Sequence, residues 1–286
     1  MASRFHARSI SLPSRSHPTT QRIEEELNKL KTWEASSKLT TDSIRVGLSG
    51  VDHLYKCVDD ILHMASTKEA VSRHQNENFL DGLLDGSVSL LDICGLTRDF
   101  MLQIKEHVQA LQSAIRRRKN DSILDNEISN YACFRKKIKK NAKRFTEALK
   151  QMENEVGLSP LVEQDLHLSA VIRVLREVNS VNSSILRSLL SFLSTPVSKP
   201  KQSRWSLVSK LMYKGVIACE GKQEKENEWE SVDTVLSEVS KFDKASASQE
   251  KLEALKTSIE DLEIGLQSVF RGLIKTRASL LNMVSQ

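Results

Sequence analysis

Apolar side chains recur at alternating spacings of three and four residues over the last 35 residues of the chain. A repeat of this kind places its members on one face of an α-helix, whereas a β-strand would need a repeat of two. The repeat therefore predicts one long amphipathic helix. Only Thr276 is polar in this stripe, which consists of Leu252, Leu255, Ile259, Leu262, Leu266, Val269, Leu273, Thr276, Leu280 and Met283.

The same repeat runs along most of the remaining chain and predicts an all-α protein, a multi-helix bundle of long amphipathic helices. In the stripe through residues 124–152, Arg135 occupies the one expected position that is not apolar. Loops are expected near 66–78, 194–203 and 219–228. Helices are expected after Thr19–Thr20, after Thr41–Asp42, over 80–86, over 87–119, from the break at 120–122 to Gly157, from Ser159–Pro160, over 205–218, from Trp229, and after a capping box of Ser246 and Gln249.

The 286 residues divide into a short tail and one helical domain. Residues 1–18 are rich in serine, arginine and histidine and have no apolar repeat, so we expect a flexible, disordered basic tail. Residues 19–286 carry the helical stripes and form the predicted bundle domain. No proline lies between Pro18 and Pro160, so nothing in that range prevents long helices.

Two arrangements would bury the final stripe: a two-stranded coiled coil or a bundle within one molecule. With Leu252 as heptad position a, the g positions are Lys251, Ser258, Gly265, Gly272 and Ser279, most of which are small. A two-stranded coil normally carries complementary charges at positions e and g, whereas small residues let a neighbouring helix approach closely. The pattern favours the bundle and leaves the coiled coil as the alternative.

The cysteine pattern and the hydropathy indicate an intracellular protein of the cytoplasm or nucleus. Cys57, Cys94, Cys133 and Cys219 stand far apart without a C-x-x-C pair, so we expect small buried thiols rather than disulfides. No apolar stretch approaches the roughly 20 residues that a transmembrane helix needs. The N-terminus also lacks the apolar core of a secretory signal.

No motif of catalysis or cofactor binding is present. The sequence contains no G-x-S-x-G, H-E-x-x-H or G-x-G-x-x-G pattern. His53, Cys57 and His63 share one predicted helix, but no fourth ligand spacing accompanies them, which favours packing and surface roles over a metal site. We therefore expect a protein that is not an enzyme and that uses no cofactor or metal.

Positive charge gathers between residues 116 and 144. Eleven cationic and three acidic residues give this segment a net charge of +8, which leaves −3 for the rest of a chain that carries +5. Such a cluster is typical of a site for an acidic protein face, an anionic membrane surface or nucleic acid, and its two halves also resemble a bipartite nuclear localisation signal. The alternative is a solvated helix face, and the lack of interleaved aromatics disfavours specific nucleic-acid binding. The cations are Arg116, Arg117, Arg118, Lys119, Arg135, Lys136, Lys137, Lys139, Lys140, Lys143 and Arg144.

The tail contains a short docking motif. Arg8, Ser9, Ser11 and Pro13 match the R-S-x-S-x-P pattern that 14-3-3 proteins bind once the second serine is phosphorylated. A phosphate on Ser11 would add about −2 charge to a basic, extended segment. The same tail, with several arginines and serines and no acidic residue before position 24, also has the composition of a plastid or mitochondrial transit peptide. A basic tail without a partner is the third reading.

Four segments, in order and spread over nearly the whole chain, resemble the plant-specific BYPASS-like family. They are FHARSISLPSRSHP at 5–18, LLDGSVSLLDICG at 83–95, LQSAIRRRK at 111–119 and SVFRGLIKTRASLLN at 268–282. The resemblance implies an α-helical plant protein of a family linked to root and shoot development. It transfers no activity, ligand or catalytic residue to this chain.

Together these patterns predict a non-enzymatic interaction or regulatory protein of plant organ development, with a protein as its partner. The alternative is a peripheral membrane-surface or organelle-associated factor that binds anionic lipid through a basic helix face.

Overall fold

Long helices lying side by side make up the computed structural model, which describes residues 18–36, 39–74, 80–117, 121–158, 165–195, 228–238 and 245–285. Among these residues there are eight helices and no strand, so the prediction of an all-α protein is confirmed. The helices are α1 (Pro18–Ser36), α2 (Thr41–Leu62), α3 (Ala65–Arg73), α4 (Asp81–Arg117), α5 (Asp121–Leu158), α6 (Leu166–Leu193), α8 (Glu228–Glu238) and α9 (Ala245–Val284).

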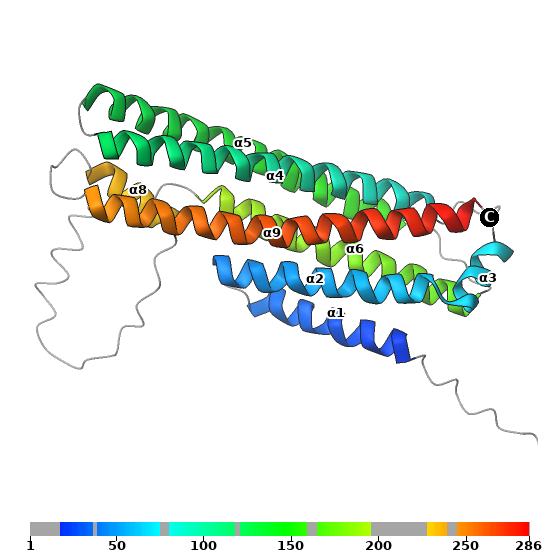
Figure 1. Cartoon of the computed structure of the whole chain (residues 1–286). Helices are drawn as coiled ribbons and strands as arrows, with labels where there is room; N and C mark the ends of the chain where they lie inside the picture. The colour runs from blue at the N-terminus through cyan, green and yellow to red at the C-terminus, as the bar shows by residue number, and fades with distance from the viewer. Residues whose placement is uncertain are drawn as a thin grey trace, which may run out of the picture.

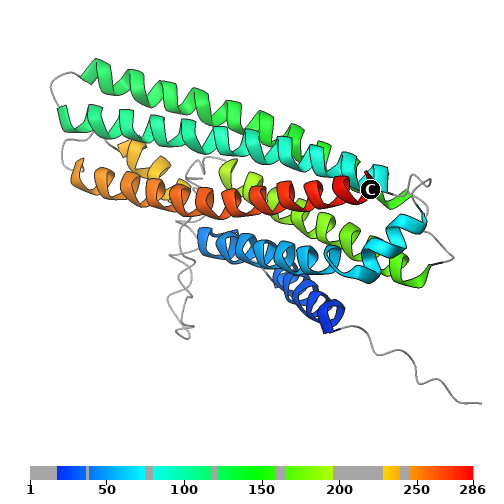
Figure 2. The same cartoon turned by 45° about the vertical axis from the view of Figure 1, so that its right-hand side comes forward.

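Five of these helices close into a ring in which each packs against two neighbours. α9 packs on α2 and α4, α4 on α5, α5 on α6, and α6 on α2. Figures 1 and 2 show α9 running lengthwise between α4 and α2. α1 lies outside the ring against α2 and α6, while α3 and α8 lie at opposite ends of the bundle (Figure 1).

The stripe of α9 explains its place in the ring. All ten of its members are buried, including the polar Thr276 at 8% exposure. Because α9 packs on α2, α4 and α8 of the same chain, its apolar face is covered within one molecule. At about 1.5 Å per residue a helix of this length extends roughly 60 Å, so it spans most of the bundle.

Helix α6 is buried on several sides because it contacts α1, α2, α3, α4 and α5. It begins at Leu166, where Asp165 Oδ1 accepts hydrogen bonds of 3.0 Å from the backbone N–H groups of His167 and Leu168. These bonds satisfy two of the donors that a helix start leaves without partners. The N-cap of α6 is thus Asp165, whereas the predicted start at Ser159–Pro160 lies outside the described residues.

Two helices differ from the sequence prediction near residues 65–87. α3 occupies Ala65–Arg73, where a polar loop was expected, because Thr67, Ala70 and Val71 form a short buried face. α4 runs without a break from Asp81 to Arg117, although a new helix was expected at Ser87.

Hydrogen bonds from α9 support α4 at that position. Arg277 Nη1 donates to Ser87 Oγ at 2.8 Å and also to the carbonyl oxygen of Leu84. α9 itself begins at Ala245, so Ser246 lies inside the helix instead of capping it. Gln249, the other half of the predicted capping box, donates from Nε2 to the Gln112 carbonyl at 2.9 Å.

The cysteines divide by exposure. Cys57 and Cys94 are buried free thiols, and burial raises the pKa of Cys94 to about 12. Cys133 is a free thiol that lies exposed on α5, so the expectation of a buried thiol is wrong at this position. Cys219 and the predicted helix over 205–218 lie outside the described residues, as do most of the loops expected over 194–203 and 219–228.

Candidate functional site

Helix α5 presents a row of exposed cations to solvent. Its opposite side is buried through residues such as Ile138 and Phe145, and the Phe145 ring stacks on Phe100 with 5.8 Å between centroids. Because 3.6 residues complete a helical turn, this buried side leaves the positions between its members outside. We call the exposed cations the basic face; they are Lys136, Lys137, Lys139, Lys140, Lys143 and Arg144.

Acidic neighbours are few along the basic face. Lys143 Nζ lies 4.0 Å from Glu147 Oε1, and the Arg144 guanidinium lies 5.6 Å from the centroid of the Phe145 ring. Within the described part of the chain no ion pair involves Lys136, Lys137, Lys139 or Lys140. No described carboxylate therefore neutralises the positive charge of these four side chains, and solvent and salt screen it over about 8–10 Å.

The other cations of segment 116–144 lie elsewhere. Arg116 and Arg117 are exposed at the end of α4, where cations favour the helix dipole, and Arg116 Nε donates to Gln249 Oε1 at 3.3 Å. Arg118 and Lys119 lie outside the described residues. Lys136 stands about 22 Å along α5 from the helix start at Asp121, at ~1.5 Å per residue, so the two halves of the segment form separate clusters.

Arg135 is the exception among the predicted anion-binding residues, because its side chain is only 5% exposed. Nη1 donates to the Leu193 carbonyl at 2.8 Å, and Nη2 donates to the Thr195 carbonyl. These carbonyls lie at the end of α6, where a helix leaves acceptors without partners and favours a cation. Arg135 thus belongs to the interior of the bundle and not to the basic face.

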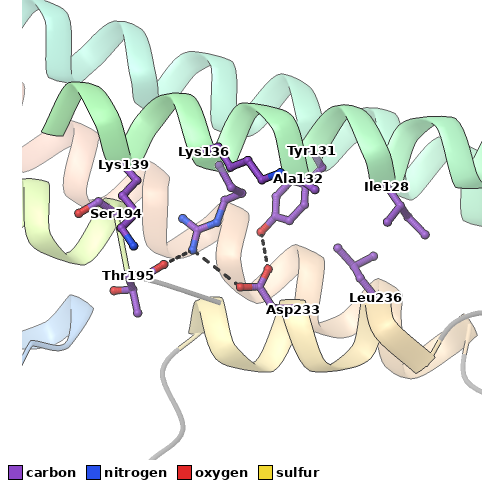
Figure 3. A pocket seen from close by; sticks show the side chains of 10 residues that line it. Ile128, Tyr131, Ala132, Lys136, Lys139, Ser194, Thr195, Asp233 and Leu236 are labelled. Carbon is purple, nitrogen blue, oxygen red and sulfur yellow. Dashed lines mark hydrogen bonds and ion pairs between the residues drawn. The ribbon is translucent and has the colours of Figure 1, made fainter. Parts of the chain in front are cut away.

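A carboxylate and two aromatic side chains complete the surroundings of Arg135. Asp233 Oδ2 lies 3.8 Å from Arg135 Nη2, and the guanidinium lies 3.9 Å from the centroid of the Trp229 ring. The Tyr131 hydroxyl donates to Asp233 Oδ1 at 3.3 Å (Figure 3). Burial raises the pKa of Asp233 although Arg135 opposes the shift, and burial raises the pKa of Tyr131 above its usual range. This cluster joins α5, the end of α6 and α8.

A cavity of about 410 Å³ opens beside this cluster. Figure 3 shows its wall formed by α5 above and α8 below. Two members of the basic face, Lys136 and Lys139, contribute to the lining, so the cavity adjoins that face. The lining residues are Ile128, Tyr131, Ala132, Arg135, Lys136, Lys139, Ser194, Thr195, Asp233 and Leu236.

Sequence reasoning found the exposed cations but missed Tyr131, Trp229 and Asp233 as members of a polar cluster. The available signal was Arg135, a charged residue on an otherwise apolar stripe, which predicts a buried partner. Nothing in the sequence around Asp233 distinguishes that carboxylate from the other acidic residues of α8.

Three further expectations concern the docking motif of the tail, membrane-spanning helices and metal binding. Arg8, Ser9, Ser11 and Pro13 lie outside the described residues. Among the described helices none is long and apolar enough to cross a membrane. The described residues also include no group of three or more His, Cys, Asp and Glu side chains that could hold a metal ion.

Comparison with known proteins places the chain in a family. A model of the family described as Protein BPS1 matches residues 47–283, a range that takes in the basic face and the cavity. No match was found among the curated proteins or among the solved structures. Because the match covers about four fifths of the sequence, the chain belongs to the Protein BPS1 family, the BYPASS-like family that its sequence resembles.

Proposed function

We propose that this protein is a non-enzymatic interaction or regulatory protein of plant organ development that binds an acidic protein partner through the basic face. Family membership supports the developmental role. The observation that carries the binding role is the basic face itself, with six exposed cations within nine residues of one helix. Four of them have no acidic partner within the described part of the chain, so their charge is free to attract an anion.

The packing of α5 on its neighbouring helices favours binding through the basic face. α5 is packed against α4 and α6, which fixes the spacing of the six backbone positions that carry the cations before any partner arrives. A preorganised surface loses less conformational entropy on association than a flexible basic segment does. Complementary charge speeds the encounter and makes it sensitive to salt, so we expect association that weakens as ionic strength rises.

The burial of aromatic rings on α5 bears on the class of partner. Single-stranded nucleic acids are held by stacking of bases on exposed aromatic side chains, in addition to cations. Tyr131, Phe134 and Phe145 are all buried, so they offer no stacking platform beside the basic face. This arrangement supports an acidic protein surface over specific nucleic-acid binding.

An anionic membrane surface is the alternative partner. Each Lys or Arg near such a surface contributes about 1 kcal/mol. Ile138 and Ala142, the apolar residues between the cations, are buried, so they cannot insert into lipid. Binding through this face alone would therefore be electrostatic and would be lost at high salt.

A charge-reversal experiment tests the proposal. The variant Lys137→Glu/Lys140→Glu/Lys143→Glu changes the basic face but leaves the cavity lining intact. Its matched control, Lys68→Glu/Lys251→Glu/Arg271→Glu, changes net charge equally at exposed positions of α3 and α9. Proximity labelling in plant cells should show that the control keeps the wild-type neighbours and that the basic-face variant loses them. Equal loss in both variants, or loss in neither, would contradict the proposal.

Vesicle flotation distinguishes an anionic membrane from an acidic protein as the partner of the basic face. Full-length protein is mixed with phosphatidylserine vesicles or phosphatidylcholine vesicles at low and physiological salt. Capture by the phosphatidylserine vesicles alone, lost in the basic-face variant and retained in the control variant, would favour lipid as the partner. Absence of capture at both salt concentrations leaves the acidic protein as the supported partner.

We also propose that the tail supplies a second, regulated contact through phosphorylated Ser11. Its support is the R-S-x-S-x-P pattern formed with Arg8, Ser9 and Pro13. Titration of a 14-3-3 protein with peptides of residues 5–18 tests it. The phosphorylated peptide should bind and the unphosphorylated peptide should not, because the phosphate supplies the charge that an arginine cluster holds. Failure of both peptides to bind would remove this contact.

A further inference from the structure

The cavity between α5 and α8 changes character along its length. In Figure 3, Lys139 lies near Ser194 and Thr195 at one end, while Ile128 and Leu236 face each other at the other end. Ile128 and Lys139 are separated by about 16 Å along α5, at ~1.5 Å per residue. The cavity is thus elongated, with a polar, cationic end and an apolar end.

Its size suits a small organic molecule. The volume of about 410 Å³ falls within the range of roughly 300–1,000 Å³ that is typical of small-molecule sites. Such sites combine apolar walls with a few polar groups that fix the orientation of the ligand. Ile128, Ala132 and Leu236 supply apolar wall, and the lysines and hydroxyls supply the polar groups.

The charge of the lining selects an anion. One carboxylate and three cations line the cavity, and the carboxylate of Asp233 is already paired with Arg135 at 3.8 Å. Lys136 and Lys139 have no ion pair among the described residues, so no described carboxylate compensates their charge in the lining. In addition, Arg135 Nε has no hydrogen-bond partner among the described residues, which leaves one donor of this buried guanidinium unused.

From this arrangement we propose that the cavity binds an amphipathic carboxylate, with the carboxylate held by Lys136 and Lys139 and an unbranched apolar chain directed toward Ile128 and Leu236. A neutral or cationic molecule with the same chain would lack the matching charge. The inference goes beyond the proposed function, because it assigns a small-molecule site to the cavity, which shares Lys136 and Lys139 with the basic face but not Lys137, Lys140 or Lys143.

Calorimetric titration of the full-length protein with sodium dodecanoate, kept below its micelle concentration, tests the site. Dodecyltrimethylammonium, which has the same chain and the opposite charge, serves as the comparison ligand. We expect saturable binding of one dodecanoate per chain and at least about tenfold weaker binding of the cation, because close charge pairs alter affinity on this scale. No binding of dodecanoate, or equal binding of both ligands, would overturn the proposal.

Paired lysine variants locate the site. Lys136→Gln/Lys139→Gln should weaken dodecanoate binding by roughly tenfold or more, whereas Lys137→Gln/Lys140→Gln should leave it within about twofold. All four positions are exposed, so neither variant disturbs the core. Equal effects of the two variants would overturn the assignment.

A variant at the apolar end supplies an independent readout. Ile128→Trp fills space at that end, so dodecanoate should lose more affinity than octanoate. Equal losses of affinity for the two chain lengths would contradict the proposed orientation of the ligand. If Ile128→Trp fails to fold, the dodecanoate affinities of the two lysine variants test the site without it. The Lys137→Glu/Lys140→Glu/Lys143→Glu variant should still bind dodecanoate. Its loss of cellular neighbours therefore reports on the basic face separately from the cavity.

Discussion

The ion pair between Arg135 and Asp233 lies inside the bundle, with 3.8 Å between Nη2 and Oδ2. Both side chains are at least nine-tenths buried, at 5% and 7% exposure. Without Asp233, the buried Arg135 guanidinium loses its anionic partner and keeps the neutral carbonyls of Leu193 and Thr195. Without Arg135, the buried Asp233 carboxylate loses its cationic partner and keeps the Tyr131 hydroxyl. We therefore expect Arg135→Ala or Asp233→Ala to lower the free energy of unfolding by about 3–5 kcal/mol, measured by urea denaturation.

Two further variants control this prediction. Lys136→Ala, at an exposed neighbouring position, should change the free energy of unfolding by no more than about 0.5 kcal/mol. The double variant Arg135→Leu/Asp233→Leu should recover most of the loss, because an apolar pair removes both buried charges together. A cost for Asp233→Ala as small as that of Lys136→Ala would show that the pair is solvated in solution.

Asp165 makes a pH-dependent contribution at the start of α6. Hydrogen bonds from the backbone N–H groups of Leu168 and His167 hold the pKa of Asp165 below its ordinary value of 3.8. Because the folded pKa is the lower one, the stabilisation is present above the unfolded pKa and is lost as the pH falls through the folded pKa. Asp165→Ala should cost about 0.5–2 kcal/mol near neutral pH.

Urea unfolding of the wild type and of Asp165→Ala at several pH values checks this expectation. The difference between the two proteins should shrink as the pH is lowered past 3.8. Asp261→Ala, at an exposed position of α9, serves as the control and should show little effect at any pH. A difference for Asp165→Ala that stays constant down to low pH would show that the carboxylate charge does not stabilise the cap.

At the scale of residues, the sequence predicted which side of a helix a side chain occupies better than which side chain it contacts. The helical repeat was enough to predict that Lys136, Lys137, Lys139 and Lys140 share the side of α5 away from Ile138. The repeat also marked Arg135 as an unusual member of the stripe. It could not pair Arg135 with Asp233, because that contact depends on how α8 packs against α5 almost one hundred residues later in the chain.

Helix α9 packs closely on α2 at two of its glycines, Gly265 and Gly272. A Cβ added at Gly272 would lie 2.8 Å from Tyr55 Cβ, whereas one added at Gly95 of α4 would meet nothing within 4 Å. We therefore expect opposite effects of the same substitution. Gly272→Ala should destabilise the fold by about 1–3 kcal/mol, because it forces α2 and α9 apart. Gly95→Ala should stabilise it by about 0.5–1 kcal/mol, because alanine favours the helix and the site is open.

Thermal and urea unfolding of the two alanine variants measure this contrast. Gly95→Ala is the internal control for helix propensity, since both glycines lie inside long helices. Stabilisation of the protein by both substitutions would contradict the close approach of α9 to Tyr55.

At the scale of elements, the length of a stripe determined how well its helix was predicted. The long stripes of α5 and α9 predicted those helices well, apart from their ends. α3 was missed because its buried face is formed by only a few residues, too few to establish a repeat. The break expected at Ser87 failed for another reason: hydrogen bonds from Arg277, nearly two hundred residues away, support α4 at that point.

At the scale of the whole molecule, the ring order of the helices was beyond the reach of sequence reasoning. The stripes consist mainly of apolar residues, and an apolar stripe does not specify which helix packs against it. α9 packs on α2 and α4, which precede it by more than a hundred residues, and only the final packing selects these contacts. The small residues beside the stripe of α9 favoured a bundle over a coiled coil, and the buried stripe confirms the bundle.

Each molecule covers its own apolar stripes and leaves the basic face of α5 outside. Hydrogen–deuterium exchange of the full-length protein at two concentrations tests it most directly. Amides from 252 to 283 should exchange slowly and at the same rate at both concentrations, because α9 is packed on helices of the same chain. Fast exchange in this range, or protection that increases with concentration, would contradict the claim.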